Sequence, residues 1–168
     1  MSFLELARQR YSTRAYKDSK VEDKKLEMIL EAGRIAPTAH NSQPVRIKVI
    51  TSEDELAKVD ECTPCRFGAP LVLLVCFDKD ICWKRSFDSK SSGQVDASIV
   101  TTQMMYMAQE LELSSCWVMH FNPFKTIEVF SLPDNLEAVA FLPIGYASED
   151  AVPSASHSKR NAVSEMLI

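Results

Sequence analysis

The residues best suited to chemistry stand near the N-terminus, in the segment Arg10-Tyr11-Ser12-Thr13-Arg14. Arg10, Ser12 and Arg14 recur at every second residue, so an extended backbone would place all three side chains on one face. Alternate residues of a strand repeat at about 6.6 Å, which lets the two guanidiniums contact points about 13 Å apart on one elongated anion. This spacing favours a phosphorylated cofactor over a compact anion. A solvated basic turn after a helix is the alternative interpretation.

The composition argues against a general affinity for polyanions. The chain has 168 residues, a formal net charge of −4 and a pI near 5.4. Such a chain has no net positive field for nucleic acid or an anionic membrane, so the arginines must act locally. No signal peptide is visible, and the longest apolar run, 69–77, is too short to cross a bilayer. We expect a single cytoplasmic domain over residues 1–168, with no nucleic-acid and no membrane partner.

The chain has five cysteines, an odd number that predicts reduced thiols rather than a disulfide framework. Cys76 and Cys116 stand in apolar segments and are expected in the core. The segment Cys62-Thr63-Pro64-Cys65 has redox or metal spacing, but no second pair completes a tetrahedral site. A plain loop is therefore favoured, and we expect no metal.

Helix and strand patterns alternate along the chain. Ser2 with Glu5, and Ser52 with Glu55, have the spacing of capping boxes that open helices. The periodicity predicts helices over 2–9, 22–36, 94–113 and 122–132, with a short one after residue 52. It predicts strands over 45–49, 70–77, 116–119 and 138–142.

A glycine-rich phosphate loop is missing. The chain has four glycines and contains neither Gly-x-Gly-x-x-Gly nor a P-loop. Side chains must therefore hold any phosphate, which strengthens the case for Arg10, Ser12 and Arg14.

Four segments, taken in order, resemble the FMN-dependent nitroreductase family. They are Arg10-Tyr11-Ser12-Thr13-Arg14, Ala36-Pro37-Thr38-Ala39-His40-Asn41-Ser42-Gln43-Pro44, Leu142-Pro143-Ile144-Gly145-Tyr146 and His157-Ser158-Lys159-Arg160. The resemblance covers essentially the whole chain. It implies an α+β, three-layer nitroreductase-like fold, with a central mixed or antiparallel sheet flanked by helices, in an intertwined homodimer. It also implies two FMN sites at the subunit interface and hydride transfer from NADH or NADPH, through flavin N5, to a nitroaromatic, quinone or related organic acceptor.

The resemblance assigns the cofactor contacts residue by residue. The phosphate side takes Arg10 and Ser12, with Lys159 and Arg160 closing on it, and Arg14 reaches the N1 and C2 carbonyl edge, where a cation favours reduced flavin. The amides of the 38–43 loop match the pyrimidine edge, and the segment 143–145 covers one flavin face, with a backbone N–H toward N5. No catalytic side chain is required, because the cofactor carries the chemistry. The cofactor-binding set is Arg10, Tyr11, Ser12, Arg14, Asn41, Gln43, Pro143, Ile144, Gly145, Lys159 and Arg160.

Several alternatives stay open from the sequence. His157 is a third phosphate contact or a surface histidine. Trp83, Phe87 and Phe124 line an acceptor pocket or pack in the core. The long helix over 94–113 and the non-periodic tail are expected at a dimer interface. A hydrolase is poorly supported, because no nucleophile triad stands out. The rival function is a flavin-binding regulatory or carrier protein without efficient turnover.

Overall fold

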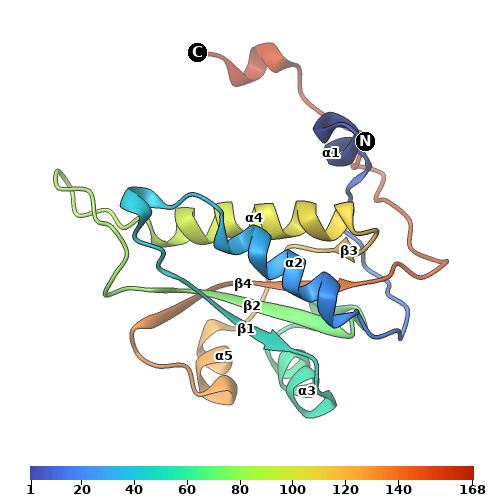
Figure 1. The fold of residues 1–168 in the computed structure, drawn as a ribbon, viewed down its shortest axis with the longest axis horizontal. Coiled ribbons are helices and arrows are strands. Elements are labelled where there is room, and N and C mark those ends of the chain that lie inside the picture. The colour runs from blue at the N-terminus through green and yellow to red at the C-terminus, as the bar shows by residue number, and fades with distance from the viewer.

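A four-stranded antiparallel sheet forms the middle layer of the computed structural model, which describes residues 1–168 (Figure 1). The strands lie in the order β1 (Val45–Ile50), β2 (Leu71–Asp78), β4 (Leu136–Gly145) and β3 (Ser114–Ser115). Every neighbouring pair is antiparallel. The predicted α+β architecture with a flanked central sheet is confirmed.

The position of strand β2 inside the sheet explains why its sequence is continuously apolar. Alternate residues point to opposite faces of a sheet, and both faces are buried here. Leu71, Leu73, Val75 and Phe77 pack in the core on one face, whereas the residues between them pack in the core on the other.

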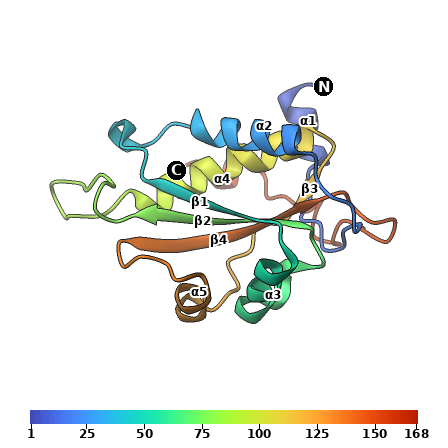
Figure 2. The same cartoon turned by 60° about the horizontal axis from the view of Figure 1, so that its bottom comes forward.

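Helices cover both faces of the sheet (Figure 2). One outer layer contains α2 (Asp23–Arg34) and α4 (Gly93–Glu110), with α1 (Phe3–Gln9) resting on α4. A Cβ on Gly33 would lie 2.9 Å from Met104 Cγ, so the missing side chain lets α2 and α4 approach closely. The other layer contains α3 (Glu53–Cys62) and α5 (Pro123–Phe130). Short 3₁₀ turns are η1 (Ala39–Asn41), η2 (Pro64–Arg66) and η3 (Val163–Met166).

One of the two predicted capping boxes forms. Ser2 Oγ accepts a hydrogen bond from the Glu5 backbone N–H at 3.3 Å, and the Glu5 carboxylate accepts from Ser2 N–H at 2.6 Å. The prediction of a capping box at Ser52 was wrong, because the Ser52 side chain makes no capping hydrogen bond. The Glu55 carboxylate instead pairs with Lys48 Nζ through Oε1 at 2.6 Å, and Ser52 Oγ donates to its Oε2 at 3.5 Å.

The predicted strand over 116–119 was also wrong. Strand β3 covers only two residues, and Val118 keeps a single isolated bridge to Phe141. Cys76 and Cys116 are buried, as expected, and all five cysteines are free thiols. No helix has the length and apolar character needed to span a membrane. No group of three His, Cys, Asp or Glu side chains is arranged to hold a metal ion.

Candidate cofactor-binding site

The arginine motif is extended, as its alternation predicted. Beyond the end of α1, Ser12 forms a parallel bridge to Ser115 at the sheet edge, and Tyr16 forms an antiparallel bridge to Ala147. Thr13 N–H donates to Ser115 O at 3.1 Å, and the Thr13 side chain is fully buried. The pleat therefore turns Ser12 and the exposed Arg14 to the side opposite Thr13.

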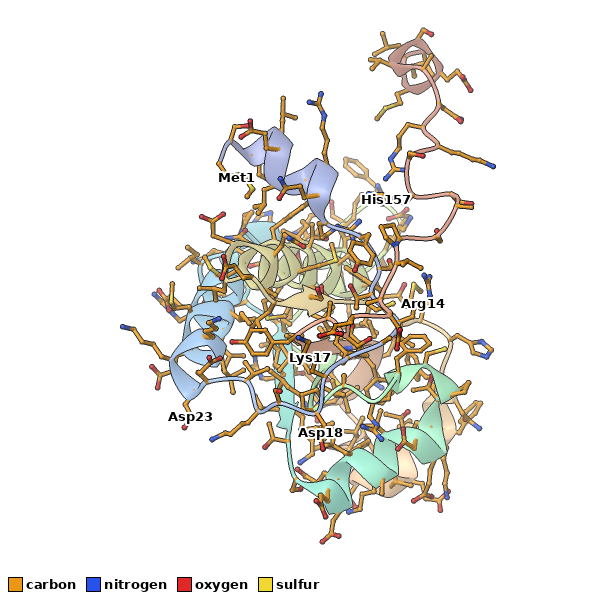
Figure 3. All side chains as sticks on the ribbon, turned by 90° about the vertical axis from the view of Figure 1, so that its right-hand side faces the viewer. Met1, Arg14, Lys17, Asp18, Asp23 and His157 are labelled. Carbon is orange, nitrogen blue, oxygen red and sulfur yellow. The ribbon has the colours of Figure 1, made fainter.

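The C-terminal tail folds back onto this motif in the same chain. Tyr11 Oη donates to Ala151 O at 3.3 Å, and His157 Nε2 lies 3.2 Å from Arg8 O. Figure 3 shows Arg14 and His157 on the same side of the molecule. Together the two segments enclose a polar cavity of about 180 Å³, lined by Arg10, Tyr11, Ser12, Arg14, Ser154, Ser156, His157 and Arg160.

The lining brings together five of the predicted residues and adds three more. His157, which the sequence left open, belongs to the cavity. Ser154 and Ser156 were missed, and the serine-rich composition of the tail is the signal that could have found them. Lys159 is exposed and does not line the cavity. Its contact with a cofactor remains a prediction.

The cavity is built for an anion that carries several oxygen atoms. Arg10, Arg14 and Arg160 form no ion pair with a carboxylate. Arg10 Nε is buried and has no hydrogen-bond partner, and Arg14 Nη1 has only a 3.3 Å contact with Ser12 O. Buried donors are normally satisfied, and guanidiniums bind phosphate by paired, charge-assisted hydrogen bonds. The residues present therefore fit the phosphate of a mononucleotide cofactor.

The segment 143–145 forms the end of strand β4. Pro143, Ile144 and Gly145 are buried inside β4, where Val72 of β2 and Ser114 of β3 pair on either side. A Cβ on Gly145 would lie 2.9 Å from Pro70 Cδ and 3.2 Å from the Tyr16 ring. Within one chain these residues form part of the sheet, and their contact with a flavin face stays a prediction.

Their observed role is to support the arginine motif. The Tyr16 hydroxyl lies 3.0 Å from Thr13 O and 3.3 Å from Pro143 O, so this side chain links the motif to β4. Burial raises the pKa of Tyr16, and the nearby Cys116 and Tyr11 add to the shift. The phenol therefore stays protonated and keeps donating.

The two predicted amide contacts lie at the opposite end of the molecule (Figure 1). Asn41 and Gln43 are exposed on the loop over 38–43, beside the first turn of α4. The arginine motif joins β3, beyond the last turn of α4. A helix of 18 residues is about 27 Å long, and an FMN molecule is shorter than that. A single chain therefore does not bring the two halves of the predicted site together.

The loop over 38–43 has a defined shape. His40, Asn41 and Gln43 have positive φ angles of 52°, 53° and 49°, a conformation that non-glycine residues adopt only when their surroundings impose it. Thr38 Oγ1 accepts from Gln43 N–H at 3.0 Å and closes the loop.

Asp96 holds this loop, and sequence reasoning missed it. The residue is 1% exposed, and its two carboxylate oxygens accept from Ala39 N–H at 2.8 Å and Ser92 Oγ at 2.7 Å. An acid placed in the first turn of a helix, next to buried positions, was the available signal.

The family assignment follows from a match that covers both halves of this site. A family model described as "Nitroreductase family" matches residues 7–67 and 64–146. The chain belongs to the nitroreductase family. Within this family, a solved nitroreductase family protein from Clostridium difficile 630 is 47% identical, with a TM-score of 0.94 over 100% of this chain and 98% of that one.

Two further relatives carry cofactor information in their names. A candidate nitroreductase from Desulfovibrio desulfuricans, solved in complex with FMN, is 26% identical, with a TM-score of 0.83 over 98% of this chain and 94% of that one. The FMN reductase [NAD(P)H] of Bacillus subtilis (strain 168) is 28% identical over 156 residues, which are 82% of this chain and 63% of that protein.

Proposed function

We propose that this nitroreductase-family protein is a homodimeric, FMN-dependent oxidoreductase that oxidises NADH or NADPH and reduces a nitroaromatic, quinone or related organic acceptor. The observation that carries the proposal is the cavity lined by Arg10, Arg14 and Arg160, whose guanidiniums have no carboxylate partner. Within it, Arg10 Nε is buried without a hydrogen-bond partner. The names of the FMN reductase and of the FMN complex among the relatives support the same cofactor.

The side chains of the cavity divide between the two ends of the cofactor. Arg10, Ser12 and Arg160 hold the phosphate, with charge-assisted hydrogen bonds worth about 1.5 to 3 kcal/mol each. Bound FMN would supply the redox chemistry, taking a hydride at N5 from the nicotinamide and passing the electron pair to the acceptor. Arg14, which is exposed and weakly bonded, reaches the ring edge, where its charge favours the reduced form. At 4 Å and an effective dielectric near 20 that attraction is about 4 kcal/mol, an upper bound for an exposed group.

A homodimer would join the two halves of the site. Because the phosphate cavity and the loop with Asn41 and Gln43 lie at opposite ends of α4, a two-fold axis across this helix would place the loop of one subunit beside the cavity of the other. Each dimer would then hold two equivalent sites.

The exposed apolar residues agree with such an interface. Phe3 of α1 and Val95 of α4 are 64% and 57% exposed and line an open groove of about 790 Å³. The end of the tail projects from the body (Figure 1) and leaves Val163, Met166 and Leu167 exposed. Exposed apolar patches mark interaction sites.

A spectroscopic experiment tests the function. The purified protein should be yellow and should release FMN, not FAD, on denaturation. Anaerobic addition of NADH or NADPH should then bleach the flavin absorbance. A colourless protein that fails to bind added FMN would contradict the cofactor assignment. A yellow protein whose spectrum neither nucleotide changes would instead be a flavin carrier.

A further inference from the structure

A second cavity, of about 400 Å³, lies at the N-terminal end of α4. Its volume is within the range of small-molecule pockets in proteins. The residues that matter are three apolar ones, Trp83, Val95 and Ile99, and two cationic ones, Arg85 and Lys90. An apolar wall with a few placed charges is the usual construction of a pocket for an aromatic ligand.

Three charged side chains line this cavity, namely Arg85, Lys90 and Asp96. Arg85 pairs with Asp88, its Nε donating to Oδ1 at 2.8 Å, whereas Lys90 belongs to no ion pair. The segment 79–92 has four cationic and two acidic residues, a local charge of +2 in a chain whose net charge is −4. The Asp96 carboxylate already accepts hydrogen bonds from Ala39 N–H and Ser92 Oγ, so Lys90 is the charged group of the lining that is left to attract an anion.

The cationic segment is held in place. Arg85 N–H donates to Lys90 O at 3.0 Å, and Ser92 N–H donates to Trp83 O at 2.9 Å. The Trp83 ring stacks on the His40 ring, with centroids 5.2 Å apart and planes 14° from parallel. The pocket is therefore a built feature of the fold, and a flat aromatic surface forms part of its lining.

The pocket adjoins the loop that the proposed flavin site uses. Ala39 lines the cavity, and His40, which stacks on Trp83, directly precedes Asn41. A ligand held here would lie next to the residues assigned to the pyrimidine edge of the flavin.

We infer that this pocket binds the electron acceptor and selects planar aromatic molecules that carry a carboxylate or sulfonate. The ring packs against Trp83, Val95 and Ile99, and the anionic group pairs with Lys90. The inference rests on the proposed function and adds to it the chemical class of the acceptor.

Two matched acceptors test the selectivity. The NADH-driven reduction of 4-nitrobenzoate and of its neutral analogue 4-nitrobenzamide is compared in the holoenzyme. One charge-assisted contact predicts that kcat/KM favours the carboxylate by roughly tenfold. The substitution Lys90→Gln should abolish this preference by lowering kcat/KM for the carboxylate to the level of the amide. Lys84→Gln is the control, because this cation lies in the same segment and does not line the cavity.

Equilibrium binding separates this inference from the proposed function. The chain has two tryptophans, so in a Trp117→Phe background Trp83 is the only fluorophore of its kind. Titration of the oxidised protein with 4-nitrobenzoate should quench the Trp83 emission, and Lys90→Gln should weaken that binding by a similar factor. If neither nicotinamide nucleotide reduces the flavin, the proposed function fails, yet this titration still reports on the pocket.

Three results would overturn the inference: equal turnover of the two acceptors, a preference that survives Lys90→Gln, or quenching that Lys90→Gln leaves unchanged. A fourth result would also overturn the inference. If the Lys90→Gln protein lost affinity for NADPH alone, the pocket would belong to the electron donor.

Discussion

The carboxylate of Asp96 accepts a hydrogen bond from the backbone N–H of Ala39 at 2.8 Å, across 57 positions of sequence. This contact fixes the loop over 38–43 to the first turn of α4. The loop carries Asn41 and Gln43, so a buried acid sets the position of exposed amides. Rigid support of this kind is what a binding loop needs.

Removing this support should weaken cofactor binding from a distance. We expect Asp96→Ala to lower the free energy of unfolding by about 1 to 3 kcal/mol, because it leaves Ala39 N–H without its partner. By loosening the loop it should also weaken FMN binding, as we expect of Asn41→Ala. Chemical denaturation and flavin titration measure the two effects. Asp134→Ala, at an exposed turn, is the control. Unchanged flavin affinity in a destabilised Asp96→Ala protein would limit Asp96 to a structural role.

Arg10 should dominate the affinity for FMN. Its loss removes a charge-assisted contact worth about 1.5 to 3 kcal/mol, so Arg10→Ala should raise the Kd by roughly tenfold to a hundredfold. Lys17→Ala is the matched control, because Lys17 is an exposed cation near the motif that does not line the cavity. Flavin fluorescence titration measures both. Equal effects of the two substitutions would mean that only the general charge matters.

Arg14 should act on the redox potential rather than on affinity. A cation near the ring edge stabilises the charge of reduced flavin, so Arg14→Ala should lower the midpoint potential. Each 1.4 kcal/mol of lost stabilisation corresponds to about 30 mV for a two-electron couple. Spectroelectrochemical titration compares Arg14→Ala with Arg10→Ala. A larger potential shift in the Arg10 variant would reverse the assigned roles.

Buried thiols should make the fold sensitive to alkaline pH. Burial raises the pKa of Cys76 from 9.0 to about 12. Between these values the unfolded chain loses a proton that the folded chain keeps, so the free energy of unfolding falls by about 1.4 kcal/mol per pH unit for this group. This contribution is complete below pH 9 and is lost as the pH rises toward 12.

Chemical denaturation of two variants between pH 8 and 11 checks this pH dependence of the free energy of unfolding. Cys76→Ala should flatten the slope. Val72→Ala, buried on the same side of β2, should lower stability equally at every pH and keep the slope. A wild-type slope in Cys76→Ala would assign the alkaline loss to other groups.

Apolar residues that recur at every second position or at helical spacing predicted the layers of this fold, because burial of one face dictates both patterns. The strand β2 and the helices α2 and α4 were found near their predicted bounds. The alternation in the arginine motif likewise predicted an extended segment. Tertiary contacts decided the rest: the Glu55 carboxylate pairs with Lys48 Nζ, and strands distant in sequence pair with both edges of β4. The Asp96–Ala39 contact joins residues whose proximity no local pattern encodes.

The central claim is that each flavin site combines the arginine cavity of one subunit with the 38–43 loop of the other. Mixing two defective variants tests it most directly. An Arg10→Ala/Arg160→Ala protein and an Asn41→Ala/Gln43→Ala protein are unfolded together, refolded and titrated with FMN at concentrations that fill only intact sites. Random reassortment makes about half of the dimers mixed, and each mixed dimer regains one intact site, so about a quarter of all sites should bind FMN. If both halves of a site belong to one subunit, the mixture will bind no more flavin than the separate variants, and the account is contradicted.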